Sequence, residues 1–226
     1  MRINIAIDGP SAAGKSTIAK RLAKKYNYIH LDTGAMYRCI ALACKMADVA
    51  WKDEEEVKKL LPQSKISFDA LGNVYLNGEN VTRRIREKDM SMGASDVSTL
   101  LSVREDLVAR QKDFAKNKGI IMDGRDIGTV VLKDAEIKIF LTASPASRAM
   151  RRYKENMEKG IPCDFDALVK DIEERDYQDT HREQSPLTQA EDAVLVDTSE
   201  MSIEEVVDTI SNIIETKFPE GVSEND

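Results

Sequence analysis

Residues 9–17 form a glycine-rich stretch whose residue types suit phosphate binding. Its sequence, GPSAAGKST, fits the pattern G-x-x-x-x-G-K-[ST] without a substitution. Glycines let backbone amides turn toward an anion, and Lys15 would reach the β- and γ-phosphate oxygens of a nucleotide. The Ser16 hydroxyl would take one ligand position of Mg²⁺. The pattern predicts a nucleotide-phosphate site, but GTPase switches, ATPases and small-molecule kinases all share it.

Arginines gather in further stretches of the chain. A planar guanidinium binds phosphate at two points and stays charged, which suits an enzyme that must hold two phosphorylated molecules against each other. Read alone, a charged helix face such as those of Arg148 to Arg152 and Arg175 to Arg182 is more often simply solvated than functional. The arginines concerned are Arg38, Arg125, Arg148, Arg151, Arg152, Arg175 and Arg182.

Carboxylates accompany two of these clusters. Asp123 directly follows the apolar run Ile120-Ile121-Met122, where it could orient Mg²⁺ through water, although an Asp-Gly turn alone is a weak signal. Arg175, Asp179 and Arg182 have the spacing i, i+4, i+7, so we expect one helix to present all three on one face.

The elements that would position these residues alternate along the chain. Apolar runs predict buried strands at 2–8, 28–32, 119–123, 137–141 and 193–197. Helical spacing or capping signals predict helices after residues 14, 32, 144, 164 and 202 and a helix through 103–114. This order predicts an α/β fold of three layers, with a parallel central sheet flanked by helices.

Two segments depart from that alternation. Residues 63–86 alternate in polarity around Gly72-Asn73 and Asn77-Gly78, which predicts a small antiparallel insert. Residues 148–182 place arginines on both sides of a loop with Gly160 and Pro162, which is typical of a mobile helical lid. We therefore expect a single kinase domain with a core (about 1–62, 87–147 and 183–226), an insert (about 63–86) and a lid (about 148–182).

Composition narrows the class of protein. The net charge of −7 disfavours a nucleic-acid polymer as partner. No apolar run reaches the roughly 20 residues that cross a bilayer, and the start lacks the features of a signal peptide, so we expect a cytoplasmic protein without membrane contact. Three cysteines without a Cys-x-x-Cys pair leave few ligands for zinc. A monomer is the default expectation.

The stretches GPSAAGKST, LDTGAMYR, DGRDIGTVV and ERDYQDTHR together resemble the bacterial cytidylate kinases, over residues 5 to about 197. The resemblance also covers the insert, which matches the enlarged monophosphate-binding region of that family. It implies direct transfer of the γ-phosphoryl group of ATP to CMP or dCMP, with Mg²⁺ as cofactor and no protein nucleophile.

The resemblance also implies roles for individual residues. ATP would be bound by Gly9, Pro10, Ser11, Ala12, Ala13, Gly14, Lys15, Ser16 and Thr17. CMP would be bound by Thr33, Tyr37, Arg38, Ser95, Arg104, Arg125, Asp126, Asp179 and Arg182. Lys15, Arg148, Arg152 and Arg175 would be catalytic, with Arg151 a further lid residue, and Mg²⁺ would be held by Ser16 and, through water, Asp123.

Within the CMP set, Arg38, Arg125 and Arg182 would hold the acceptor phosphate, whereas Ser95, Arg104 and Asp126 would read the cytosine. A carboxylate accepts from the cytosine amine and repels the uracil carbonyl, so Asp126 gives a physical reason for C over U. Without the resemblance, Ser95 could be a plain helix-cap or loop serine.

The chain departs from the family at Thr33 and Gln178, which leaves the choice between CMP and dCMP open. The alternatives are another small-molecule kinase, a nucleotide-binding switch without catalysis, or an interaction module with a relic site.

Overall fold

The computed structural model describes residues 1–69, 72–158 and 160–222. By its internal contacts the chain divides into two compact units, Met1–His30 with Lys118–Asp226, and Leu31–Asn117. The second unit contains the predicted insert together with helices before and after it, although residues 70–71 of the insert lie outside the described ranges, as do residues 223–226 of the predicted core. The division into core, insert and lid stays a prediction.

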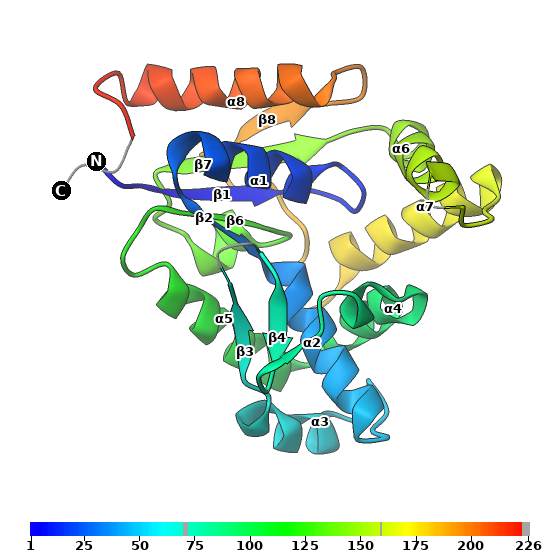
Figure 1. The fold of residues 1–226 in the computed structure, drawn as a ribbon. Coiled ribbons are helices and arrows are strands. Elements are labelled where there is room, and N and C mark those ends of the chain that lie inside the picture. Colours follow the sequence, from blue (N-terminus) through cyan, green and yellow to red (C-terminus); the bar gives the residue numbers. More distant parts are fainter. Residues whose placement is uncertain (70–71, 159, 223–226) are drawn as a thin grey trace. The chain divides into compact units, whose positions relative to one another are not determined.

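The first unit is built around a five-stranded central sheet (Figure 1). Its strand order is β2-β6-β1-β7-β8, and β1 pairs in parallel with both β6 and β7. The strands are β1 (Asn4–Asp8), β2 (Ile29–Asp32), β6 (Ile120–Gly124), β7 (Ile137–Thr142) and β8 (Val194–Asp197). β1 and β6 are buried at every position, which explains why their sequences are apolar runs rather than alternating patterns. The predicted parallel α/β sheet is confirmed.

Four long helices belong to this unit: α1 (Lys15–Tyr26), α6 (Pro145–Glu158), α7 (Phe165–His181) and α8 (Ile203–Lys217). α1 and α8 pack against the sheet through one core that includes Ile5, Leu22 and Ile210. The predicted capping box of Ser202 and Glu205 begins α8. α6 and α7 pack against each other and form the predicted pair of arginine-bearing helices.

Two features of this unit differ from the sequence prediction. α7 ends at His181, and Arg182 is its C-cap residue with extended backbone angles, so the helix carries Arg175 and Asp179 but not Arg182. In addition, a short π-helix, Ile127–Val131, follows β6. The spacing i, i+4, i+7 gave no sign of the helix end, because no glycine or proline marks it.

The second unit contains helices α2 (Thr33–Met46), α3 (Glu54–Leu60), α4 (Lys88–Val97) and α5 (Leu101–Phe114), and two short 3₁₀ helices, Leu61–Gln63 and Arg84–Arg86. Its antiparallel sheet has the order β3 (Ile66–Phe68), β4 (Val74–Leu76), β5 (Glu79–Asn80). Asn77 and Gly78 both have positive φ, at 53° and 84°, as a two-residue type I′ hairpin requires. The predicted antiparallel insert is confirmed in the described residues.

α4 was not predicted, because it contains a glycine and two serines that favour helix poorly. Gly93 is required there by packing, since a Cβ would come within 2.6 Å of the Trp51 ring. Ser95 lies inside this helix, so the alternative that it is a loop or helix-cap serine is wrong.

Candidate active site at the carboxyl end of the central sheet

The glycine-rich stretch connects β1 to α1, which is the context that the phosphate-loop pattern requires. Gly9 has φ of +146°, and a Cβ there would lie 2.0 Å from the carbonyl oxygen of Leu141, so only glycine fits. Gly14 caps the N-terminus of α1 with φ of +87°. The loop thus brings the positive end of a helix and its unpaired N–H groups to the edge of the sheet, an arrangement that binds phosphate.

Lys15 is almost fully buried, and its ammonium group donates to the carbonyl oxygen of Pro10 at 2.7 Å. Burial, together with the nearby charge of Arg125, lowers the pKa of Lys15 to about 7, although the carboxylates Asp123 and Asp179 oppose the shift. A phosphate group here would supply the negative charge that this buried ammonium lacks. The local electrostatics therefore favour an anion at the loop.

Ser16, Asp123 and His30 form a chain of polar contacts beside Lys15. The Ser16 hydroxyl donates to Asp123 Oδ2 at 2.7 Å, and His30 Nε2 lies 2.6 Å from Asp123 Oδ1. Asp123 is 4% exposed and belongs to β6. The sequence predicted Asp123 near the loop but gave no sign of His30, whose partner lies 93 residues away.

The donor set at this point fits Mg²⁺, which takes hydroxyl, carboxylate, phosphate and water oxygens. Within residues 1–69, 72–158 and 160–222, no group of three or more His, Cys, Asp or Glu side chains could hold a metal ion. A Mg²⁺ ion at Ser16 and Asp123 would accordingly need nucleotide phosphates and water for its other ligands. This is the arrangement expected for a metal that arrives with ATP.

Asp8 is a buried carboxylate that the sequence interpretation missed. Its two oxygens accept from the backbone N–H groups of Ile127 and Gly128, at 2.8 and 2.7 Å. Burial raises the pKa of Asp8 to about 6, although these two bonds oppose the shift. Asp8 therefore fastens the turn after Asp126 to the end of β1, directly before the phosphate loop.

A second cluster of charges lies where β6 ends. Arg125 Nε donates to Asp179 Oδ2 at 2.6 Å, and Arg182 Nη2 lies 3.7 Å from Asp126 Oδ1. Burial alone would raise the pKa of Asp179, but the charges of Arg125, Arg175 and Arg182 outweigh it and hold that pKa below its ordinary value. Five residues predicted to contact the acceptor or the transferred group are thus brought together from the turn after β6, from α7 and from the C-cap of α7.

The predicted lid arginines differ in their surroundings. Arg148 is 3% exposed and donates to the carbonyl oxygens of Ala143 and Ser11 and to both carboxylate oxygens of Asp176. Arg151 donates to Thr198, whereas Arg152 is exposed. Arg148 thereby links α6, α7 and the phosphate loop. Its predicted catalytic role, like that of Arg152 and Arg175, stays a prediction.

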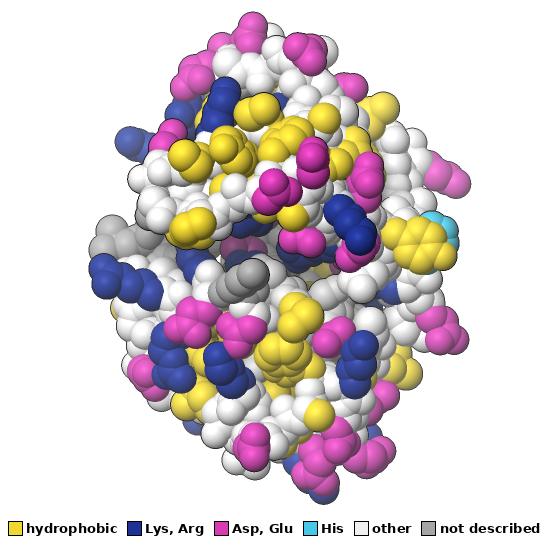
Figure 2. Space-filling view, turned by 90° about the vertical axis from the view of Figure 1, so that its right-hand side faces the viewer, with side chains coloured by type: hydrophobic (Ala, Val, Ile, Leu, Met, Phe, Trp, Pro, Cys, Tyr) yellow, Lys and Arg dark blue, Asp and Glu magenta, His cyan; other side chains and the backbone are white. Residues whose placement is uncertain are grey.

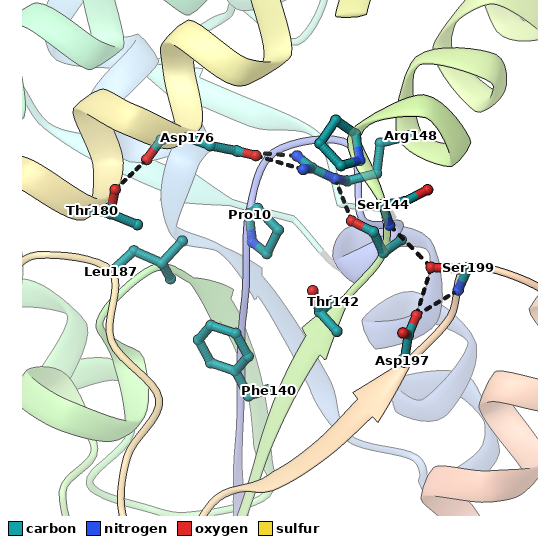
Figure 3. A pocket seen from close by; sticks show the side chains of 12 residues that line it. Pro10, Phe140, Thr142, Ser144, Arg148, Asp176, Thr180, Leu187, Asp197 and Ser199 are labelled. Atoms are coloured by element: carbon teal, nitrogen blue, oxygen red, sulfur yellow. Dashed lines mark hydrogen bonds and ion pairs between the residues drawn. The ribbon is translucent and has the colours of Figure 1, made fainter.

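A cavity of about 500 Å³ opens beside the phosphate loop (Figure 3). Its lining includes Pro10, the carboxyl ends of β7 and β8 at Thr142 and Asp197, and the Arg148–Asp176 pair. Ligands of α/β proteins bind outside the carboxyl ends of parallel strands, so this cavity has the expected position for a nucleotide. Of these five residues, the sequence interpretation had placed only Pro10 and Arg148 in the site.

The second unit holds the other predicted CMP-binding residues. Arg38 Nη2 donates to Asp32 Oδ2 at 2.7 Å, and Asp32 also caps α2 by accepting from Ala35 N. Arg104 is 4% exposed and donates to the carbonyl oxygen of Ser98 at 3.5 Å. Thr33, Tyr37 and Ser95 lie on α2 and α4, which pack against each other. Their predicted contacts with CMP stay predictions.

Among the described residues, the face drawn in Figure 2 has no single-sign charged patch. On the face drawn in Figure 2, acidic and basic side chains are interspersed, with hydrophobic side chains among them. No helix in the described part of the chain is long and apolar enough to span a bilayer.

A protein-family model described as "Cytidylate kinase" matches residues 5–216. A "Cytidylate kinase" of Leuconostoc mesenteroides is 54% identical over 217 residues, which cover 95% of this chain and 97% of that protein. A "Cytidylate kinase" of Ligilactobacillus salivarius is 53% identical and covers 96% of this chain and 98% of that protein. The similarity thus extends over nearly the whole length of both chains.

Among solved structures, an uncharacterized protein from Eubacterium ventriosum has a TM-score of 0.53 at 14% identity, covering 96% of this chain and 99% of that one. A shikimate kinase from Bacteroides thetaiotaomicron has a TM-score of 0.50 at 13% identity, covering 95% of this chain and 99% of that one. At this level of identity the likeness concerns the fold alone.

Proposed function

The chain belongs to the cytidylate kinase family, and from this premise we propose that it transfers the γ-phosphoryl group of ATP to CMP and dCMP, giving CDP and dCDP. One observation carries the proposal. β1 and β6 are parallel neighbours in which Asp8 pairs with Gly124, so the phosphate loop and the Arg125–Asp126 turn leave the sheet at the same edge. A donor-phosphate loop and a cluster of arginines for an acceptor phosphate therefore lie together.

The chemistry needs little from the protein beyond position and charge. The attacking oxygen of a nucleoside monophosphate is already anionic near neutral pH, so no strong general base is required. Lys15 would bind the phosphates of ATP, and Arg125 and Arg182 would bind the acceptor phosphate. Arg38 is proposed as a further ligand of the acceptor phosphate on the sequence alone. Alignment and charge neutralisation of this kind account for most of the rate in phosphoryl transfer.

Mg²⁺ is part of the proposal because the oxygens of Ser16 and Asp123 suit it. When bound, the ion would neutralise charge that develops on the phosphate oxygens. We also propose that the nucleoside part of ATP occupies the cavity in Figure 3, since Pro10 of the phosphate loop lines it. A monomeric state and a cytoplasmic location are the remaining parts of the proposal, and only the sequence-based expectations support them.

Asp126 is the residue proposed to select cytosine. Its carboxylate is 6% exposed and has Arg182 as a neighbour. In that position it can accept from the exocyclic amine of cytosine, whereas the O4 carbonyl of uracil would face a carboxylate without a proton between them. Roles for Ser95 and Arg104 in base recognition, and for Asp179 near the ribose, belong to the same proposal.

A different small-molecule kinase is the main alternative, because the fold is shared with a shikimate kinase. A nucleotide-binding switch is a second one, but the sequence lacks the Asn-Lys-x-Asp run that typically recognises guanine. The near-complete family match makes both weaker than the proposed function.

The test is a coupled assay of ADP release with Mg²⁺ and ATP and one acceptor at a time: CMP, dCMP, UMP, AMP or shikimate. We expect CMP and dCMP to give the highest kcat/KM, with UMP at least about tenfold lower. ADP release with CMP that does not exceed the rate with ATP alone would refute the proposal. Highest activity on shikimate or AMP would favour another kinase.

A further inference from the structure

His30 occupies a position for which the proposed mechanism has no use. It lies on β2, and its ring faces Asp123 on the neighbouring strand β6. The two oxygens of Asp123 have different partners: His30 Nε2 lies 2.6 Å from Oδ1, and the Ser16 hydroxyl donates to Oδ2 at 2.7 Å. A carboxylate has no proton to give, so the Nε2 nitrogen carries the hydrogen of the first contact.

From this geometry we infer that His30 is a positioning residue: it fixes the rotation of the Asp123 carboxylate and, through it, directs the Ser16 oxygen toward the Mg²⁺ that accompanies ATP. The inference rests on the proposed function, in which Ser16 and Asp123 hold this ion.

The direction of the Ser16 oxygen lone pairs follows from the number of protons that each group has. The Ser16 hydroxyl has a single proton and gives it to Asp123, so its oxygen lone pairs point away from the carboxylate and are available to a cation. If the carboxylate turns, the hydroxyl proton follows it and the lone pairs change direction. The orientation of Asp123 thus determines whether Ser16 can act as a ligand.

The His30 ring opposes rotation of the Asp123 carboxylate. Rotation about the last bond of an aspartate side chain has broad, shallow minima, so one contact holds it poorly, whereas contacts on both oxygens hold it well. The side chains of His30 and Asp123 are only 10% and 5% exposed. Little water can therefore replace the ring, and losing it leaves a buried oxygen without this partner.

The test compares three substitutions at His30. His30→Leu removes the donor at similar size, and His30→Asn leaves an amide that is too short. His30→Gln places an amide nitrogen near the former Nε2. The measured quantity is the Mg²⁺ concentration that gives half-maximal rate at fixed ATP and CMP. We expect it to rise about tenfold or more in the Leu and Asn variants, as is usual for partners of metal-binding groups, and to stay near wild type in the Gln variant.

Two further measurements separate positioning from a general loss of structure. KM for CMP should be unchanged, and Mg²⁺ should strengthen ATP binding less in the Leu variant than in wild type when binding is measured by calorimetry without CMP. Ile29→Ala, on the same strand but 62% exposed, is the matched control and should behave as wild type.

Should the Leu variant not fold, the Asn and Gln pair gives the same comparison. Equal Mg²⁺ dependence in wild type and all folded variants, or equal losses in the Gln and Asn variants, would overturn the inference while CMP kinase activity of the wild type stands. A wild type that is inactive on CMP would instead overturn the proposed function, and the calorimetric comparison would still report on His30.

Discussion

The phosphate-loop region and the α6–α7 pair both hold buried charges, but by different means. At the loop, short side chains bond to the backbone or to a neighbouring element: Asp8 to the N–H groups of Ile127 and Gly128, and Asp123 on β6 to Ser16 on α1. On the helices, long arginines bond to carboxylates, as Arg148 does to Asp176. The bonds at the loop can move only with the sheet. On the helices, a phosphate can replace the carboxylate partner of an arginine, because it offers a guanidinium the same two-oxygen geometry.

The difference suggests a division of tasks. A loop held in this way would keep the donor phosphates in one place, which supports alignment. On the helices, aspartates hold the arginines in position and separate their like charges. The comparison predicts that loop substitutions alter catalysis first, whereas Arg148, which also bonds to Ser11 and Ala143, behaves as a structural link between the two regions.

The largest effect is expected at Lys15. Lys15→Met keeps the length and apolar contacts of the side chain but removes its charge, so kcat should fall about a thousandfold or more, equal to about 4 kcal/mol of transition-state stabilisation. Coupled assays at saturating CMP measure it. The matched control is Lys20→Met on the exposed face of the same helix, which should retain wild-type kcat. A fall of less than tenfold in a folded Lys15→Met variant would contradict the role of this loop.

The next effect concerns stability. Arg148→Ala should lower the free energy of unfolding by about 3 kcal/mol, because it breaks a largely buried ion pair and leaves the carbonyl oxygens of Ser11 and Ala143 without this donor. Denaturant unfolding measures the change. Arg152→Ala, at an exposed position of the same helix, should change stability by less than about 0.5 kcal/mol. Equal losses in both variants would remove the contrast between an anchoring and an exposed arginine.

The same contrast explains which features the sequence could predict. The phosphate loop, the Asn77-Gly78 turn and the Ser202 capping box are local patterns, so each was recognised from a few adjacent residues. Asp8 and His30 were missed because their partners lie more than 90 residues away and depend on which strands are neighbours. Asp176 was missed because its ion pair with Arg148 depends on how two helices pack against each other, which no local pattern indicates. Sequence patterns thus recognised local features better than contacts between distant segments of the chain.

A third prediction concerns pH and the rigid region. The pKa of Asp8 is raised from 3.8 to about 6 in the folded protein, so between these values the folded state keeps a proton that the unfolded chain has released. The stabilisation from this group is complete below pH 3.8 and is lost as pH rises through about 6. A shift of about two units corresponds to about 3 kcal/mol.

Asp8→Asn removes this titration. At every pH the variant should lose some stability, because an amide cannot accept from both N–H groups. Between pH 4 and pH 7, however, wild type loses up to about 3 kcal/mol that the variant does not lose, so the unfolding free energy of the variant should rise by that amount relative to wild type. Chemical denaturation at several pH values gives the difference directly. Asp208→Asn, an exposed position on α8, should show no comparable trend. A difference between Asp8→Asn and wild type that does not vary with pH would mean that burial does not raise the pKa of Asp8.

The smallest effect tests base selection at the turn that Asp8 holds. Asp126→Asn keeps the shape of the side chain but replaces one acceptor with a donor, so the residue can bond either to the cytosine amine or to the uracil carbonyl. The ratio of kcat/KM for CMP to that for UMP should fall about tenfold, equal to about 1.4 kcal/mol, mainly through a gain on UMP. Asp134→Asn, exposed and a few residues further along, should leave the ratio unchanged. Equal losses on CMP and UMP would show that Asp126 supports Arg182 and the turn rather than reading the base, because such a role would not distinguish the two pyrimidines.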